Sequence, residues 1–177
     1  IKKRDPAANN YLEIILLCPG LHAIFFHRIA NLFWIIKLNF IAKVIAYISR
    51  MITGIEIHPA AKIGKNLFID HGVGVVIGET SIIGNNVLIY HGVTLGGTSL
   101  KKGKRHPTIN DDAIIGAGAK ILGPITIGKQ SRVGANAVVT RNVESFTTVM
   151  GIPAKVIKKN NKNFKPYGTP VDLDFNN

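Results

Sequence analysis

The chain has 177 residues, with 22 basic and 10 acidic side chains and a formal net charge of +12. This length favours a single domain, and the charge favours an anionic partner such as nucleic acid, a membrane surface or a phosphorylated cofactor. Aromatic residues are sparse and not interleaved with basic ones, so we expect no base-stacking surface and no nucleic acid partner. The single cysteine, Cys18, excludes an internal disulfide and suits a reducing compartment, so we expect a cytoplasmic protein.

The first part of the chain, residues 1–53, predicts a helical segment. Asp5 and Pro6 form a start signal, because Asp can cap free N–H groups and Pro fits the first helical position. Residues 18–20 (Cys-Pro-Gly) interrupt the pattern, so a second helix is expected from about 21 to 37 and a third from about 40 to 51. These helices are apolar on more than one face, which predicts contacts with other subunits of an oligomer.

Nothing in this helical part predicts a membrane partner. Polar residues interrupt the apolar stretch at 21–36, which falls short of the ~18 apolar residues that a membrane span needs. The basic residues at 2–4 are followed by Asp5 and Pro6 instead of an apolar core, so no cleavable signal is expected. The chain begins with Ile1 rather than Met, and we expect it to begin inside a longer natural chain.

Residues 54–159 carry an aliphatic residue at every sixth position, often followed by Gly. A period of six matches neither a helix nor a strand and is typical of hexapeptide repeats, which predict a mainly β fold, a left-handed parallel β-helix. We interpret the Gly residues as permitting corners where φ would otherwise be strained. The thirteen aliphatic positions are Ile57, Ile63, Ile69, Ile77, Ile83, Ile89, Leu95, Ile109, Ile115, Ile121, Ile127, Val133 and Val139.

The period is broken twice. The step from Ile69 to Ile77 is eight residues, and the step from Leu95 to Ile109 is fourteen, so residues 96–108 are expected to leave the β-helix as a loop. Insertions in repeat proteins map to loops on the binding face. The loop is Gly-rich and basic and contains a His near its end, so it is a candidate part of a site. Residues 160–177, rich in Asn and Lys, predict a mobile tail.

The numbering of the repeats predicts one column of side chains. If three hexads form a coil and the loop replaces no side, four hexads, those at Ile69, Ile89, Ile115 and Val133, share one face. Their third residues are His71, His91, Ala117 and Ala135. Adjacent members would lie one strand spacing apart, roughly 4.8 Å. Two imidazoles followed by two small residues predict a groove for a long ligand whose reactive end meets the imidazoles.

Several motifs give the chain a close resemblance to the serine acetyltransferase family over roughly residues 4–158. The most specific are Asp-His at 70–71, Leu-Gly-Gly-Thr at 95–98 and Arg-His-Pro at 105–107, with further matches at 4–7, 56–64, 72–80, 115–123 and 151–154. The resemblance implies transfer of acetyl from acetyl-CoA to the hydroxyl of L-serine, giving O-acetyl-L-serine for cysteine biosynthesis. It also implies that no metal takes part.

The resemblance assigns roles to ten residues. It implies that His71 is the general base, that His106 is a second site histidine, and that Glu56 stands where the family often has an Asp that orients the catalytic imidazole. It places Asp5, Asp70 and Arg105 around serine, with Arg105 on its carboxylate, and Gly97, Thr98, Ala117 and Ala135 along the CoA arm. An imidazole, with an ordinary pKa of ~6.5, can take the hydroxyl proton. The phosphates of CoA have candidate partners in six lysines, Lys101, Lys102, Lys104, Lys155, Lys158 and Lys159.

The family also implies an assembly. We expect a homotrimer or a dimer of trimers, with a site shared between subunits that brings His71 of one chain near the loop of another. A partnership with O-acetylserine sulfhydrylase is not assumed, because the family docks a C-terminal Ile and this chain ends at Asn177.

Three alternatives remain open from the residues alone. A γ-type carbonic anhydrase shares this fold with zinc held by three His, but it needs a closely spaced His pair that this sequence lacks. A non-catalytic β-helix that serves as an assembly partner would leave the basic loop without a purpose. A hexapeptide acetyltransferase acting on a sugar or another small acceptor is the nearest competitor.

Overall fold

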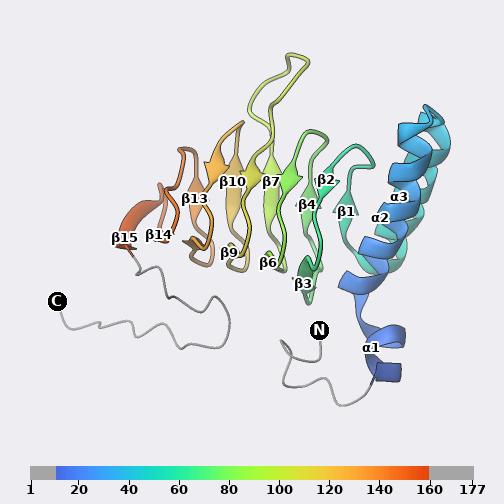
Figure 1. Cartoon of the computed structure of the whole chain (residues 1–177), viewed down its shortest axis with the longest axis horizontal. Helices are drawn as coiled ribbons and strands as arrows, with labels where there is room; N and C mark the ends of the chain where they lie inside the picture. Colours follow the sequence, from blue (N-terminus) through green and yellow to red (C-terminus); the bar gives the residue numbers. More distant parts are fainter. Residues whose placement is uncertain (1–10, 160–177) are drawn as a thin grey trace.

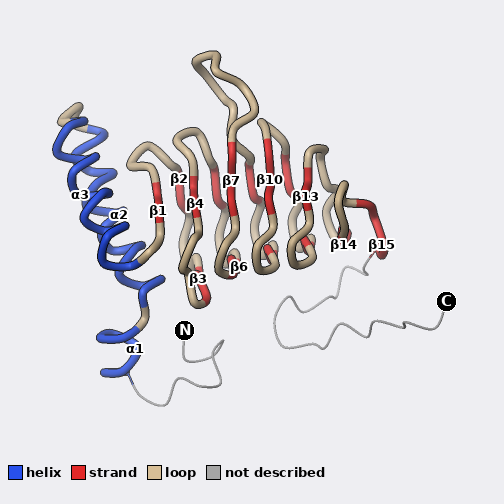
Figure 2. Tube along the Cα trace, turned by 180° about the vertical axis from the view of Figure 1, so that it is seen from behind, coloured by secondary structure: helices blue, strands red, loops and turns tan. Residues whose placement is uncertain are grey.

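In the computed structural model, residues 11–159 are described, and they form a helical hairpin followed by a three-sided β-helix (Figure 1). Asp5 and the expected tail at 160–177 lie outside the described residues. Figure 2 shows the same arrangement from behind, with the helices at one end of the strand-bearing part.

The helices are α1 (Tyr11–Leu17), α2 (Pro19–Ile35) and α3 (Asn39–Thr53). Helix α2 begins two residues earlier than expected, because Pro19 itself takes the first helical position after the extended Cys18. Helix α3 ends at Thr53, two residues later than expected, with Gly54 in the left-handed conformation that closes many helices. Helices α2 and α3 lie side by side next to β1 (Figure 1).

The strands form three sheets, each one side of the β-helix. Sheet A contains β1 (Glu56–Ile57), β4 (Val76–Ile77), β7 (Thr94–Gly96), β10 (Lys120–Leu122) and β13 (Val138–Val139). Sheet B contains β2 (Lys62–Ile63), β5 (Ile82–Ile83), β8 (Thr108–Ile109) and β11 (Thr126–Ile127). Sheet C contains β3 (Phe68–Asp70), β6 (Leu88–Tyr90), β9 (Ile114–Ile115), β12 (Arg132–Val133), β14 (Thr147–Met150) and the antiparallel β15 (Lys155–Lys159).

The core confirms the hexad prediction. All thirteen aliphatic residues are buried, and the strand register stacks them in columns, for example Ile77 on Leu95 and Leu95 on Ile121. Each coil therefore covers the apolar side of the next, which is how a repeat too small to fold alone obtains a core.

The prediction that the repeat glycines permit corners of strained φ is wrong. Gly64 and Gly116 do not have positive φ; a Cβ on Gly64 would lie 2.6 Å from the Gly84 carbonyl oxygen, so close approach of the next coil excludes a side chain. Positive φ occurs instead at corner residues with polar side chains, including Asn66, Asn86 and Asp112. These side chains bond to one another from coil to coil, at 3.0 Å and 3.2 Å, and so stabilise the corners.

Helix α2 is anchored to the first coil by polar side chains. The Arg28 guanidinium donates to the carbonyl oxygens of Ile63 (2.7 Å) and Gly64 (2.6 Å), and the Asn31 amide donates to that of Pro59 (2.7 Å). Next to Arg28 on the same helix, His27 is 3% exposed, and its buried Nδ1 has no hydrogen-bond partner among residues 11–159. Burial, with Arg28 adding, lowers the pKa of His27 from 6.5 to about 4.

Because the fold lowers the pKa of His27, we expect the protein to lose stability in mild acid. The unfolded chain protonates residue 27 below its ordinary pKa, whereas the folded chain keeps it neutral, so the unfolded state binds more protons as the pH falls from 6.5 towards 4. At pH 5 the expected loss is about 2 kcal/mol in the free energy of unfolding. Urea unfolding at pH 7.5 and pH 5, at one fixed protein concentration, measures it.

The matched control is His27→Gln, which cannot titrate. We expect His27→Gln to be less stable than the parent at pH 7.5 but to lose about 2 kcal/mol less between the two pH values, since all other titrating groups are shared. An equal loss in both proteins would show that His27 is not kept neutral in the fold.

Apolar side chains remain exposed on the outer face of the helical segment, among them Phe40, Tyr47 and Met51 on α3. Of the described helices, none is long and apolar enough by itself to cross a membrane; α1 and α2 together meet the length and composition test but are bent by 64°.

Candidate active site

The corner between sheets C and A carries the first group of candidate residues. The hexads at Ile69, Ile89, Ile115 and Val133 are in register on sheet C, which confirms the expected shared face. The backbone N–H of Gly118 donates to the His91 oxygen (2.8 Å), and that of Asn136 donates to the Ala117 oxygen (2.7 Å), so successive corners stack directly. The four third residues, His71, His91, Ala117 and Ala135, therefore follow one edge.

His71 is the most distinctive residue of this edge. Its φ of 59° lies in the left-handed region, a conformation that other corner residues such as Asn66 and Asn86 share. The ring is exposed and meets the His91 ring edge-on at 6.1 Å between centroids. Among the described residues no hydrogen bond to the His71 ring is present, so both nitrogens are available to a substrate.

Asp70 precedes His71 at the end of β3 and is paired in the sheet with Tyr90. Burial, with the Asp70 carboxylate adding, raises the pKa of Tyr90, so this phenol stays neutral and can act as a hydrogen-bond donor. Asp70 is half-buried beside the exposed imidazole. It thus supplies a negative charge close to the edge.

The corner between sheets A and B carries the second group. The loop leaves after β7, projects away from the β-helix in Figure 1 and returns at β8, so it replaces no side of a coil. Its returning end is fixed to the preceding coil: the Lys104 ammonium donates to the oxygens of Thr80 (2.7 Å) and Pro107 (3.2 Å). The Ile82 N–H also donates to Pro107 (3.1 Å).

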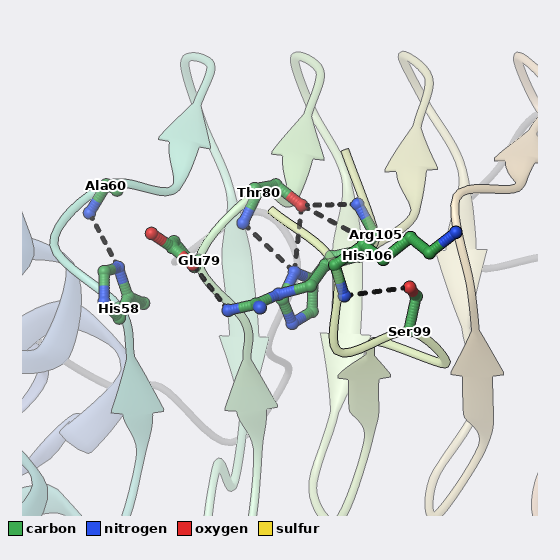
Figure 3. Close-up of polar contacts among 8 residues, drawn as sticks. His58, Ala60, Glu79, Thr80, Ser99, Arg105 and His106 are labelled. Atoms are coloured by element: carbon green, nitrogen blue, oxygen red, sulfur yellow. Dashed lines mark hydrogen bonds and ion pairs between the residues drawn. The ribbon is translucent and has the colours of Figure 1, made fainter. Parts of the chain in front are cut away.

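His106 is held on Thr80 at this corner (Figure 3). Its Nδ1 lies 2.9 Å from the Thr80 Oγ1 and accepts a hydrogen bond from the Thr80 N–H at 3.2 Å. The ring is buried, with 8% of the residue exposed. Burial, with Arg105 adding, lowers the pKa of His106, which favours the neutral imidazole.

Arg105 is oriented by Glu79. The guanidinium Nη2 lies 2.6 Å from the Glu79 Oε2, with 30% of the Arg side chain exposed. A guanidinium has five donors, so one ion pair leaves others free for a carboxylate ligand. His58 stands at the equivalent corner of the preceding coil, with its ring edge-on to Trp34 at 5.1 Å, and burial lowers the pKa of His58.

The remaining candidates divide between these places. Gly97 adjoins the second group: a Cβ there would lie 3.3 Å from the His106 Nε2, and the Thr98 hydroxyl would lie 3.1 Å from a Cβ on Gly123. Glu56 is elsewhere, because its carboxylate forms a 3.0 Å ion pair with Arg50 of α3. Among the described residues no hydrogen bond or ion pair joins Glu56 to His71. Asp5 lies outside the described residues.

Within one chain the two groups stay apart. His71 precedes sheet A along its coil and Thr80, with His106 on it, follows sheet A, so the width of this sheet separates the two imidazoles. Sequence reasoning missed Thr80, Glu79 and His58 as parts of the second group. The first two are in a motif that carries the family resemblance, Gly-Glu-Thr at 78–80, and this was the available signal.

No metal centre is visible in the described part of the chain. Across residues 11–159, no group of three or more His, Cys, Asp or Glu side chains is placed to bind a metal ion. The two imidazole pairs, His71 with His91 and His58 near His106, lie on different edges of the β-helix.

Comparison with known families first defines the class. The family model described as bacterial transferase hexapeptide (six repeats) matches residues 106–141. Among solved structures, serine acetyltransferase from Neisseria gonorrhoeae in complex with serine superposes with a TM-score of 0.86 at 43% identity, covering 89% of this chain and 64% of that chain. Soybean serine acetyltransferase gives 0.85 at 45% identity, with 88% and 64% covered. The chain therefore spans less than two thirds of these solved chains.

Curated relatives then define the family. Serine acetyltransferase of Bacillus pumilus is 57% identical over 159 residues, which is 90% of this chain and 73% of that protein. Serine acetyltransferase of Helicobacter pylori is 53% identical over 159 residues, 90% of this chain and 93% of that protein. The chain belongs to the serine acetyltransferase family, and so to the acyltransferases.

Proposed function

We propose that this chain transfers acetyl from acetyl-CoA to the hydroxyl of L-serine, giving O-acetyl-L-serine and CoA for cysteine biosynthesis. The observation that carries the proposal is the 57% identity to the Bacillus pumilus enzyme. The alignment covers 159 of the 177 residues and is therefore longer than the repeat region at 54–159, so the likeness is not confined to the repeats. A cytoplasmic location goes with it, because the single cysteine suits a reducing compartment.

The reaction requires a base, because a serine hydroxyl is a weak nucleophile at neutral pH. In the proposed step, Oγ forms a bond to the thioester carbonyl carbon while its proton passes to His71. The carbon–sulfur bond then breaks, and the leaving sulfur takes the proton from the imidazolium. His71 suits this role because its ring is exposed and no described residue bonds to either nitrogen.

Serine binding is proposed for the second group. Arg105 binds the serine carboxylate, because the planar guanidinium can donate two parallel hydrogen bonds to it. The Glu79 ion pair holds the guanidinium in place before the substrate arrives, which lowers the entropy lost on binding. Asp5 and Asp70 remain proposed contacts of serine, and Glu56 a proposed partner of the base only if its pair with Arg50 opens.

The CoA arm is proposed to lie along Ala117 and Ala135, with Gly97 and Thr98 of the loop beside it. The fit rests on side-chain size, because small residues succeed the imidazoles along one edge and leave the backbone accessible. Exposed Lys101, Lys102, Lys155 and Lys158 supply positive charge for the phosphates.

A homotrimer, or a multiple of three, is part of the proposal, since the two groups of one chain lie on different edges and neighbouring subunits can bring them together. The exposed apolar face of α3 supports further contacts between subunits. Light scattering at micromolar concentration is expected to give the mass of three chains or a multiple. A monomer would contradict the shared site.

The proposed reaction is tested by thiol release from acetyl-CoA with a panel of acceptors. We expect L-serine to be the best acceptor and L-serine methyl ester, which lacks the carboxylate, to be poor. A sugar or amine accepted better than serine would replace the proposed substrate, and no thiol release with any acceptor would favour a non-catalytic assembly partner. Metal analysis of the same preparation tests the carbonic anhydrase alternative.

A further inference from the structure

We infer that Thr80 is a positioning residue: it holds His106 as the neutral tautomer with the proton on Nε2, so that His106 donates a hydrogen bond to an oxygen of the bound substrate and does not act as a base. This inference rests on the proposed function for the identity of the substrate. The tautomer itself follows from the hydrogen bonds around Thr80.

The Thr80 hydroxyl has one proton and two acceptor sites. Both acceptor sites are taken, because the backbone N–H groups of Arg105 and His106 each donate to Oγ1 at 3.0 Å. The hydroxyl proton must therefore point to its remaining neighbour, the His106 Nδ1 at 2.9 Å. Every hydrogen-bonding capacity of this hydroxyl is then used.

The His106 Nδ1 receives a second donor. The backbone N–H of Thr80 also donates to it, at 3.2 Å, and a backbone N–H can only donate a hydrogen bond, never accept one. A nitrogen that accepts two hydrogen bonds carries no proton, so the neutral ring is protonated at Nε2. In the opposite tautomer a proton on Nδ1 would face two hydrogen-bond donors, the hydroxyl and the backbone N–H of Thr80.

The ring is fixed in this orientation by its seat. A Cβ on Gly78 would lie 2.0 Å from the His106 Cδ2 and 2.2 Å from Nε2, so the ring rests directly on the Gly78 backbone and only glycine leaves room for it. In the part of the chain that the structure describes, Nε2 has no hydrogen-bond partner. The same nitrogen lies beside Gly97, which the family resemblance places along the CoA arm.

Charges around the ring oppose its protonation. Burial, then Arg105, lowers the pKa of His106, with Lys104 and His58 acting in the same direction and Glu79 acting against them. Each of these groups stands at the same corner, on the loop or on the preceding coils. The two site imidazoles thus have different roles, since His71 is free to accept a proton and His106 offers one in a hydrogen bond.

Nitrogen NMR of the intact protein with ¹⁵N-labelled histidine rings tests the tautomer without any assay of activity. We expect the His106 signals, assigned by their loss in His106→Gln, to show a protonated Nε2 and a bare Nδ1 at pH 7.5. His58, whose Nδ1 accepts from the Ala60 N–H at 3.1 Å, is expected to show the same pattern and provides an internal comparison. A proton on the His106 Nδ1 would overturn the inference.

Two pairs of variants test the role. Thr80→Val, which removes the hydroxyl, is expected to lower kcat/KM for serine by about tenfold or more and to raise the Nδ1–H population, whereas Thr80→Ser restores both. His106→Gln, whose amide NH₂ can reach the place of Nε2–H, is expected to retain at least about tenfold more activity than His106→Asn, whose amide stands near Nδ1. Gln and Asn variants of equal activity would overturn the donor role, as would an unchanged tautomer in Thr80→Val.

The experiments distinguish a failure of the proposed function from a failure of the role inferred for Thr80. If the unmodified protein releases no thiol with serine, the substrate is wrong, yet the ring spectrum still reports the His106 tautomer. If serine is acetylated but the ring carries its proton on Nδ1, the function stands and the role of Thr80 is wrong.

Discussion

His71→Ala is expected to lower kcat for serine acetylation by roughly 10²–10⁴-fold, the usual contribution of a positioned general base. The KM values for serine and acetyl-CoA should change little, because the imidazole acts mainly as the hydroxyl proton leaves. The pH profile of kcat/KM should also lose its acidic limb, since the group whose protonation inactivates the enzyme has been removed. Steady-state rates of thiol release from pH 5.5 to 9 measure all three quantities.

His91→Ala is the matched control for this prediction. His91 is also exposed and lies one coil away, with its ring 6.1 Å from that of His71, but it belongs to none of the family motifs. We expect its variant to stay within a few-fold of the parent enzyme. A larger loss of kcat in His91→Ala than in His71→Ala, with both variants folded and of unchanged mass, would show that His71 is not the base.

Arg105→Ala is expected to raise the KM for serine strongly and to leave the KM for acetyl-CoA nearly unchanged. Loss of a buried charge-assisted pair costs on the order of 2–5 kcal/mol, and each 1.4 kcal/mol corresponds to about tenfold in affinity. The structure gives a reason for the selectivity, because Glu79 holds the guanidinium at the corner between sheets A and B. Initial rates with each substrate varied in turn make the measurement.

The control for Arg105 lies on the same loop. Leu100 is fully exposed at 101% and is part of no motif, so Leu100→Ala tests whether any change in the loop disturbs serine binding. We expect its KM for serine to stay within about twofold of the parent. Equal losses for serine and acetyl-CoA in Arg105→Ala would mean that this residue serves the fold of the loop or the acetyl donor.

The β-helix was predictable from the sequence because its period is set by one physical requirement. Every sixth residue has to be aliphatic to cover the coil beneath it, and the thirteen residues that obey this rule are all buried. The same numbering predicted the edge with His71 and Ala117, since a column follows from register alone.

The second group was less predictable. Loop length says nothing of where a loop returns, and the bonds from Thr80 to His106 join residues 26 apart in sequence. The reason for the repeat glycines was also not predictable. Close approach of the next coil and a positive φ both require Gly, so the sequence looks the same in either case. Only the positions of the neighbouring atoms show which requirement applies. The ion pair of Glu56 with Arg50 was likewise not predicted, because the sequence does not show which of its many basic residues lies next to Glu56.

Mixing two inactive subunits tests the central claim most directly, namely that His71 and Arg105 of different chains form one serine-acetylating site. His71→Ala and Arg105→Ala protein would be unfolded together, refolded as a one-to-one mixture and assayed for thiol release. The serine concentration is kept near the KM of the parent, where both variants are expected to be nearly inactive. In random trimers a site is intact when one chain supplies His71 and its neighbour supplies Arg105, so recovery to about a quarter of the parent activity is expected. A mixture that stays as inactive as its two components, while a refolded parent control regains full activity, would show that both residues act within one chain.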